Sequence, residues 1–351
     1  MSVHVIDAPS ALQRLKTFDA ILDARSEGEY ALDHLPGADN WPSLNDQERV
    51  QVGTLYKQVS PFEAQKIGAA LVAQNISRHI LAHVMDKPKS WKPLVYCWRG
   101  GKRSNSLALI LGQIGFHVTL IEGGYKAFRS ALVLDIPKRV QPLRFRVLCG
   151  PTGSGKTRLL HALSQAGAQV LDLEGLANHR SSVLGIIPGQ AQPSQKAFET
   201  LVWTQLQQFD PEREVFVESE SRKVGNLTVP ESLMEAMRQS PCVRMEVSLQ
   251  DRVHLLLEDY DYFVQQPELF CERLSRLSEI KGKAVVDEWQ SQARQGQFSE
   301  VVEALLVTHY DPVYARSTRN NFARFDEAGV LVLDATDAQA MQGAARQLMQ
   351  G

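Results

Sequence analysis

Short apolar runs alternate with longer stretches of helical periodicity along the first 135 residues. The clearest apolar runs are AILDAR (20–25), PLVYCW (93–98) and VTLIEGG (118–124). They predict buried strands because polar or glycine-containing segments flank them. Helical periodicity marks EAQKIGAALVAQNI (63–76) and SLALILGQIG (106–115). Strands that alternate with helices predict an α/β domain with a parallel sheet covered on both faces.

A second series of apolar runs begins near residue 144. The runs RVLCG, AQVLDL, REVFVES, CVRMEVS and GVLVLDA predict further strands. Residues 251–316 show helical periodicity with many charges, which predicts a helical insertion. The stretch 136–143 contains two prolines and two basic residues, which favours an inter-domain connection. We therefore expect one domain at 1–135, a basic linker at 136–143 and a second domain at 144–351.

The segment GPTGSGKT lies directly after a predicted strand and before a predicted helix. It matches G-x-x-x-x-G-K-[ST], a loop whose backbone N–H groups surround a phosphate while its lysine reaches the outer oxygens. The residues expected to bind a diphosphate group are Gly150, Gly153, Ser154, Gly155, Lys156 and Thr157. The Thr157 hydroxyl is also a candidate ligand for Mg²⁺. Because the loop recognises phosphates and not a base, it does not by itself imply ATP.

Acidic residues follow the strands next to this loop: Asp172, Glu174, Glu218 and Glu220. Near a bound phosphate such carboxylates are candidates for organising Mg²⁺ or for acting as a base. A solvated carboxylate at a strand end is an equally good interpretation of each one.

Cys97 ends an apolar strand and is followed by the basic, glycine-containing loop WRGGKRS. Backbone N–H groups of such a loop and the N-terminus of the next helix favour a thiolate. Arg99, Lys102 and Arg103 add positive charge near the sulfur. The pattern predicts a reactive nucleophile, although a buried structural role is the commoner fate of a lone cysteine.

Composition narrows the class of protein. The formal net charge is only −2, from 38 basic and 40 acidic side chains, so any contact with RNA must come from a local patch. The four cysteines form no C-x-x-C pair, which favours a reduced compartment over a disulfide framework or a zinc site. No stretch approaches the roughly 20 apolar residues of a membrane span. We therefore expect a soluble cytoplasmic protein with no membrane partner.

Several segments of the first domain resemble the rhodanese family. ILDARSEGEYALDHLPGADNWP (21–42) resembles its entry motif through Asp23, Arg25, Glu29, Tyr30, His34, Pro36, Gly37 and Ala38. YCWRGGKRS (96–104) resembles its active-site loop, and GFHVTLIEGGYKAFR (115–129) resembles its closing strand and turn. Arg103 lies six positions after Cys97, one more than in common sulfur-transferring rhodaneses. The longer loop resembles that of related cell-cycle-type phosphatases, so a phosphate-bearing donor fits better than thiosulfate.

A rhodanese-like domain followed by a P-loop domain resembles the bacterial tRNA 2-selenouridine synthase family. The segments that carry this resemblance are 45–71, LDLEGLANHRSSVLG (171–185), QPSQKAFE (192–199), FVESESRKVG (216–225) and HYDPVYARS (309–317). The resemblance covers nearly the whole chain. It implies an α/β fold in which a rhodanese-like parallel-sheet domain precedes a P-loop NTPase-like α/β domain with a helical insertion.

The resemblance implies a transferase that acts on the wobble position of glutamate, glutamine and lysine tRNAs. Members of the family convert 2-thiouridine to 2-selenouridine in two steps. S-geranylation by geranyl diphosphate comes first, and selenium from selenophosphate then displaces the geranylthio group. The resemblance implies no tightly bound cofactor, and it makes a selenophosphate-producing enzyme a candidate partner.

Roles for individual residues follow from the resemblance. Cys97 is expected to handle selenium through a Cys–Se intermediate, and the expected selenophosphate binders are Arg99, Gly100, Gly101, Lys102 and Arg103. The P-loop is expected to hold the diphosphate of geranyl diphosphate, and apolar surface in the helical insertion is a candidate for its chain. Trp98 is a candidate for stacking on the wobble base. Candidates for the tRNA backbone are Lys126, Arg129, Lys138, Arg139, Arg144 and Arg146.

Other functions stay open on the sequence. A rhodanese-related phosphatase would use Cys97 and Arg103, but it leaves the P-loop without a role, and Tyr96 replaces the histidine usual before the cysteine. An ATP-dependent P-loop enzyme with a rhodanese sulfur carrier would consume ATP during transfer. A nucleotide-gated RNA-binding module would need no reactive cysteine.

Overall fold

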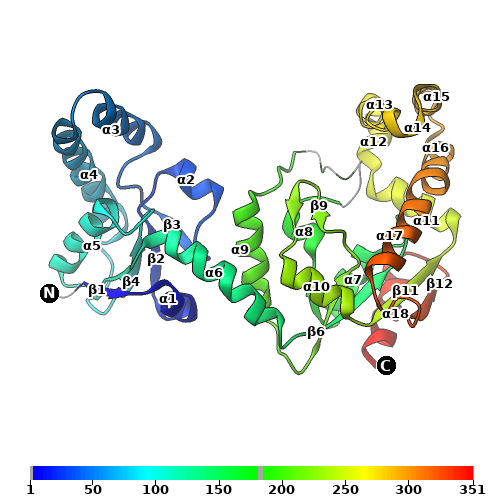
Figure 1. The fold of residues 1–351 in the computed structure, drawn as a ribbon, viewed down its shortest axis with the longest axis horizontal. Coiled ribbons are helices and arrows are strands. Elements are labelled where there is room, and N and C mark those ends of the chain that lie inside the picture. The colour runs from blue at the N-terminus through cyan, green and yellow to red at the C-terminus, as the bar shows by residue number, and fades with distance from the viewer. Residues whose placement is uncertain (1–2, 181–184, 186, 188, 351) are drawn as a thin grey trace. The chain divides into compact units, whose positions relative to one another are not determined.

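The computed structural model describes residues 3–180, 185, 187 and 189–350. Two compact units divide the chain: residues 1–136 with 193–204, and residues 137–192 with 205–351. Each unit contains a parallel sheet and helices, so the predicted α/β class is confirmed (Figure 1).

The first unit is built on a parallel sheet in the order β1-β5-β4-β2-β3. Its strands are β1 (His4–Ile6), β2 (Ala20–Asp23), β3 (Ala38–Asn40), β4 (Pro93–Tyr96) and β5 (Thr119–Ile121). Strand β4 is buried along its whole length, as expected for an apolar strand between two neighbours. The apolar pattern does not predict β1 or β3, because each has 3 residues and is partly exposed.

Helices connect these strands and begin and end where the sequence provides caps. They are α1 (Ala8–Arg14), η1 (Leu15–Thr17), α2 (Glu27–Leu32), α3 (Asp46–Gln58), α4 (Pro61–His83), α5 (Lys102–Ile114) and α6 (Gly124–Val140). The Ser60 side chain accepts the Glu63 N–H before α4, and Pro61 occupies the first turn. Helix α5 ends at Gly115, whose φ of 112° suits glycine.

The segment expected as a linker, 136–143, differs from the prediction. Helix α6 continues through Pro137 to Val140, and strand β6 begins at Arg144. Ile136 and Val140 are buried, and the Gln141 N–H donates to the Pro137 carbonyl at 3.0 Å. Burial of these apolar side chains outweighs the helix-breaking tendency of the proline, so only a short connection separates α6 from β6.

Helix α9 (Gln195–Leu206) lies next to α6, although the sequence predicts it in the second domain (Figure 1). The Trp203 indole N–H donates to Asp135 at 2.9 Å, and its ring meets Phe128 edge to face. Arg129 donates to the Thr200 hydroxyl at 2.9 Å. An aromatic contact and polar bonds to α6 therefore place residues 193–204 in the first unit.

A buried ion pair joins the entry motif to the centre of the first sheet. The Arg25 guanidinium lies 2.5 Å from Asp23, and both side chains are at most 1% exposed. Arg25 also donates to the Asp33 carbonyl at 2.7 Å and lies 3.9 Å from the centre of the Tyr125 ring. Burial alone would lower the pKa of Arg25, but hydrogen bonds and charge from Asp23 raise it above its ordinary value. The Arg25 guanidinium is therefore buried together with its counter-charge, Asp23.

The second unit contains a parallel sheet in the order β12-β11-β6-β8-β7. Its strands are β6 (Arg144–Cys149), β7 (Gln169–Leu171), β8 (Glu214–Glu218), β11 (Cys242–Val247) and β12 (Gly329–Leu333). All five coincide with predicted runs. A small antiparallel pair, β9 (Lys223–Val224) with β10 (Leu227–Thr228), follows β8.

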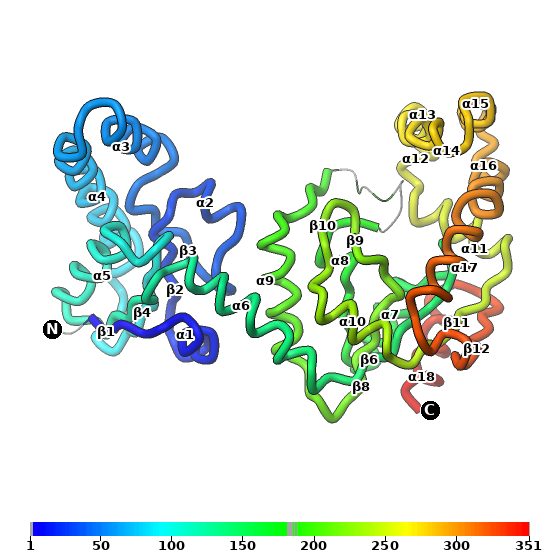
Figure 2. Tube along the Cα trace, viewed as in Figure 1, coloured from blue at the N-terminus to red at the C-terminus, as the bar shows by residue number. Residues whose placement is uncertain are grey.

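Helices of the second unit form two groups. Those around the sheet are α7 (Lys156–Gln165), α8 (Leu173–Ala177), α10 (Glu231–Gln239) and α18 (Ala338–Gln350). The predicted helical insertion contains α11 (Leu249–Asp259), α12 (Asp261–Gln265), α13 (Pro267–Ser275), α14 (Ser278–Lys281), α15 (Lys283–Arg294), α16 (Phe298–Leu305), η2 (Leu306–Tyr310) and α17 (Asp311–Asn321). Figure 2 shows α12 to α15 gathered apart from the sheet. They share a separate apolar core that includes Phe270 and Trp289. No helix in the described part of the chain is long and apolar enough to cross a membrane.

Asp23→Asn should lower the free energy of unfolding of the first unit by about 3 kcal/mol, because it leaves the buried Arg25 guanidinium without its counter-charge. Urea unfolding followed by tryptophan fluorescence measures this, since four of the five tryptophans lie in this unit. Asp86→Asn is the matched control, because Asp86 is 78% exposed in its ion pair with Lys87, and it should leave stability nearly unchanged. Equal effects of the two substitutions would contradict a structural role for the buried pair.

Candidate functional site

Cys97 lies directly after β4, and α5 begins at Lys102. The Gly101 N–H donates to the Cys97 sulfur at 3.2 Å, and the Ser104 hydroxyl donates to it at 3.1 Å. The sulfur therefore sits at the N-terminus of α5, where free N–H groups and the helix dipole stabilise negative charge. This is the environment that the sequence predicts for the sulfur, while its nucleophilic role stays a prediction.

Two glycines allow the cysteine loop to pack against the turn between β5 and α6. The Tyr125 N–H donates to the Cys97 carbonyl at 2.8 Å. A Cβ on Gly124, whose φ is 58°, would clash with that carbonyl oxygen. Gly100 has a φ of 69°, and a Cβ there would lie 3.3 Å from the Gly123 nitrogen. Both positions therefore need glycine, and the loop geometry depends on the EGGYK segment.

The three cations expected around Cys97 differ in exposure and partners. Arg99 and Lys102 are exposed. Arg103 is half-buried and forms an ion pair with Glu29 on α2, at 2.6 Å. Burial raises the pKa of Glu29, but the hydrogen bond and charge of Arg103 lower it below its ordinary value. A donor anion would therefore have to compete with Glu29 for the Arg103 guanidinium.

Trp98, expected to stack on a base, already has neighbours within the first unit. Its ring stacks on Tyr125 with centroids 5.4 Å apart, and the Lys196 ammonium lies 5.6 Å from its centre. The side chain is half-buried. These contacts suit a packed aromatic, and stacking on the wobble base stays a prediction.

Several cations expected on a tRNA-binding surface are paired with other groups of the same chain. Arg129 pairs with Glu199, Arg144 donates to the Glu212 carbonyl, and Arg146 pairs with Glu214. Lys126 and Lys138 are exposed, and Arg139 is half-buried. The exposed lysines are therefore better candidates for a phosphate backbone than the paired arginines.

The P-loop connects β6 to α7 as the sequence predicts. Gly153 and Gly155 have φ values of 81° and 78°, which suit glycine and turn the backbone around a central space. A Cβ on Gly150 would clash with the Ser154 side chain. The Lys156 ammonium donates to the Gly150 carbonyl at 2.7 Å. The Lys156 side chain thus reaches back to the first residue of the loop.

Arg252 links the P-loop to the helical insertion, a contact that the sequence analysis missed. Its Nε donates to the Thr152 carbonyl at 2.9 Å, and its guanidinium pairs with Asp311 at 2.5 Å. A Cβ on Gly153 would lie 3.0 Å from Leu256, which places α11 directly against the loop. The only available sequence signal was the segment HYDPVYARS, which contains Asp311.

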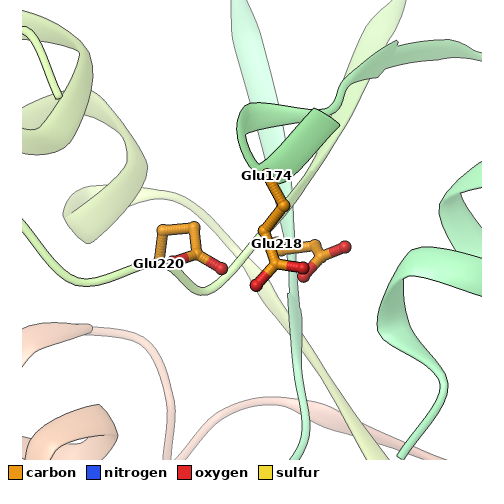
Figure 3. Close-up of side chains that lie close together, drawn as sticks. All are labelled: Glu174, Glu218 and Glu220. Atoms are coloured by element: carbon orange, nitrogen blue, oxygen red, sulfur yellow. The ribbon is translucent and has the colours of Figure 1, made fainter. Parts of the chain in front are cut away.

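Carboxylates of Glu174, Glu218 and Glu220 converge beside the P-loop (Figure 3). Their candidate ligand oxygens all lie within 4.8 Å of one another, and the Thr157 hydroxyl donates to Glu174 at 3.4 Å. Glu218 is 3% exposed, and its Oε1 has no hydrogen-bond partner among the described residues. An all-oxygen set with an unsatisfied buried carboxylate next to a phosphate loop fits Mg²⁺.

Glu218 carries the clearest electrostatic perturbation of this cluster. Burial raises its pKa well above the ordinary value, and the negative charges of Glu174 and Glu220 raise it further. Lys156 opposes this shift. A cation bound beside Glu218 would oppose this shift and favour the carboxylate form.

Asp172 does not join the other three predicted acidic residues. Its side chain accepts the Gly175 N–H at 2.8 Å, which caps the N-terminus of α8. The other carboxylate oxygen lies 3.3 Å from His161 Nε2. Among the described residues, only the three glutamates lie close enough together to share a metal ion, so capping accounts for Asp172.

A cavity of about 540 Å³ contains these features of the second unit. The P-loop, the three glutamates and Tyr314 of α17 line it. His179 also lines it, and burial lowers the pKa of this histidine. The cavity has room for a diphosphate and a cation, with more space left over.

Comparisons with known proteins match two domain families to successive parts of the chain. The tRNA 2-selenouridine synthase AAA domain family matches residues 143–268, and the rhodanese-like domain family matches residues 7–131. A tRNA 2-selenouridine synthase from Nitrosomonas europaea is 38% identical over 247 residues, which cover 68% of this chain and 63% of that protein. A tRNA 2-selenouridine synthase from Pseudomonas syringae pv. syringae is 33% identical over 339 residues, which cover 88% of this chain and 91% of that protein. The chain belongs to the tRNA 2-selenouridine synthase family.

Membership in this family covers both units, since the second relative matches most of the chain. Among solved structures, a rhodanese-like domain protein from Staphylococcus aureus is 18% identical and covers 36% of this chain and 91% of that chain. Its TM-score of 0.24 is too low to add to the family assignment. Part of the cavity wall, formed by Tyr310 and α17, follows the end of the matched AAA domain at residue 268.

Glu218→Gln should make the free energy of unfolding less dependent on pH. Burial and Glu174 raise the folded-state pKa of Glu218 above 4.5, so its contribution to stability is full below that pH and is lost as pH rises through the folded pKa. As pH rises above 4.5, the free energy of unfolding should therefore fall less in the variant than in the wild type. Urea titrations without divalent cations measure the difference, with exposed Glu288→Gln as the control. Parallel pH curves for wild type and Glu218→Gln would show that folding does not raise the pKa of Glu218.

Proposed function

We propose that the chain is a tRNA 2-selenouridine synthase, a transferase that converts 2-thiouridine at the wobble position to 2-selenouridine. The glutamate, glutamine and lysine tRNAs are its substrates, geranyl diphosphate is the alkyl donor and selenophosphate is the selenium donor. The observation that carries the proposal is the presence of two glycine-containing strand-to-helix loops, one with Cys97 and one with Lys156, in a chain of this family. Each loop serves one donor.

The P-loop serves the geranylation step. The sulfur of 2-thiouridine attacks the first carbon of geranyl diphosphate, the carbon–oxygen bond breaks and diphosphate leaves with the electron pair. Loop N–H groups and the Lys156 ammonium stabilise the charge on the departing diphosphate. Bound Mg²⁺ would neutralise further charge on the diphosphate, with Thr157, Glu174 and Glu218 as the residues that would hold it.

S-alkylation also releases the proton on N3 of the base, because the alkylated product has a C2–N3 double bond. A carboxylate near the reacting sulfur can accept this proton. Glu220 is 5% exposed and lines the cavity that contains the P-loop, so it is the candidate acceptor. In this proposal Glu218 stays with the phosphate side of the cavity, where Thr157 and Lys156 lie close to it.

The Cys97 loop serves the selenation step. A thiolate that attacked selenium would leave phosphorus reduced to the level of phosphite, whereas attack at phosphorus breaks the P–Se bond and releases selenide without a redox change. We therefore place Cys97 as the nucleophile toward phosphorus, which replaces the Cys–Se intermediate expected from the family resemblance. Selenide then attacks C2, geranylthiolate leaves with the electron pair, and water hydrolyses phosphocysteine to phosphate.

Lys156→Ala should slow geranylation by about 10²- to 10³-fold, because it removes a donor that stabilises the leaving diphosphate. Selenation of pre-geranylated tRNA should stay near the wild-type rate. Single-turnover assays with nucleoside mass spectrometry measure both steps, and Lys283→Ala on the exposed surface is the control.

Ligand binding to the wild-type protein tests the alternative of an ATP-dependent enzyme. Calorimetry should show tighter binding of geranyl diphosphate than of ATP to the wild type. Tighter binding of ATP, together with a requirement for its hydrolysis, would replace our assignment with an ATP-dependent enzyme.

Cys97→Ala should abolish selenium incorporation and leave geranylation within about twofold of the wild type, because the thiolate belongs to the selenium-donor site. Nucleoside mass spectrometry of tRNA incubated with each donor in turn measures this. Mass spectrometry of acid-quenched protein should detect phosphocysteine in the wild type only. Equal loss of both steps in a folded variant would contradict the division between the two loops.

A further inference from the structure

A small apolar cavity lies inside the helical insertion. Its side chains come from α11, α12, α13 and α16 and include Leu257, Phe263, Phe270, Phe298, Val302 and Leu305. Several of them belong to the separate apolar core of the insertion. The cavity has a volume of about 50 Å³, so this core is not filled completely.

This apolar cavity meets the larger P-loop cavity. Thr152, Leu256, Tyr260 and Tyr310 line both. Thr152 belongs to the P-loop itself, and Leu256 packs against Gly153. The charged end and the apolar end of one ligand could therefore lie on the two sides of this shared boundary, which we call the mouth.

We propose that this apolar cavity and its mouth bind the isoprenoid chain of the diphosphate ester whose charged end lies in the P-loop. The inference rests on the proposed function, and it specifies where in the second unit the chain lies. An apolar wall favours a hydrocarbon, because a nucleoside placed there would leave its polar groups without hydrogen-bond partners.

The size of the cavity sets the length of chain that fits. An engineered apolar cavity of roughly 150 Å³ binds benzene, so about 50 Å³ admits only the end of a ten-carbon chain. The carbons nearer the diphosphate lie in the mouth, between Leu256, Tyr260 and Tyr310. A five-carbon chain reaches only the mouth, and a fifteen-carbon chain exceeds the space. Each methylene group that gains burial should raise affinity about fourfold.

Val302 provides the test, because it is half-buried and lines the apolar cavity. Val302→Phe should fill the space and shift the preference between geranyl and dimethylallyl diphosphates at least tenfold toward the shorter chain. Val302→Ala should enlarge it and improve use of farnesyl diphosphate. Val307→Phe is the matched control, since Val307 is 50% exposed in the following helical turn and does not line the cavity.

The measurements are competition between the three isoprenoid diphosphates in transfer to thiolated tRNA, and calorimetry of each ester beside inorganic diphosphate. The affinity for inorganic diphosphate should be the same in all variants. If wild-type protein transfers the geranyl group but both Val302 variants keep its chain-length preference, the chain binds elsewhere and the inference is wrong.

Failure of the proposed function gives a different result. If the wild type transfers no isoprenoid group, calorimetry still tests the cavity. Tighter binding of geranyl diphosphate than of inorganic diphosphate, lost in Val302→Phe and kept in Val307→Phe, would support the cavity as a hydrocarbon site. Equal affinity of the wild type for the two compounds would overturn it.

Discussion

Both candidate sites depend on one constraint, the passage of a buried parallel strand into a helix through a glycine-containing turn. Strand β4 leads through the Cys97 loop to α5, and β6 leads through the P-loop to α7. Such a turn exposes the first N–H groups of the helix at the end of the strand, where they attract an anion. The same strand-to-helix geometry therefore occurs once in each unit.

What differs between the two turns is the charge around them. The Cys97 loop contains cations, and one of them, Arg103, is paired with Glu29. The P-loop lies beside three carboxylates, and burial raises the pKa of one of them, Glu218. A bound cation would offset the repulsion between these carboxylates and a strongly negative ligand, whereas the first turn carries its own positive charge.

Local sequence patterns predicted the parts of the structure that depend on neighbours in the chain. The apolar runs located the buried strands, and GPTGSGKT located the P-loop because its glycines and lysine act within eight consecutive residues. Pairs of residues far apart in the chain were not predictable in this way. Examples are Arg252 with Asp311, and Arg103 with Glu29, since nothing in the surrounding sequence distinguishes a charged residue that pairs from one that faces solvent. Asp172 was grouped with the glutamates by position, but its capping role depends on a helix only 5 residues long.

Helix α9 has a consequence for how the chain can be divided. Because residues 193–204 pack with residues 1–136, the polypeptide passes between the two units three times. No single cut separates them into complete parts. A fragment that ends near residue 135 would expose the surface of Phe128 that Trp203 covers, and a fragment that starts near residue 144 would carry α9 without its partner helix. The two units are thus structurally distinct but interleaved in sequence, so the chain is not a simple tandem of independent modules.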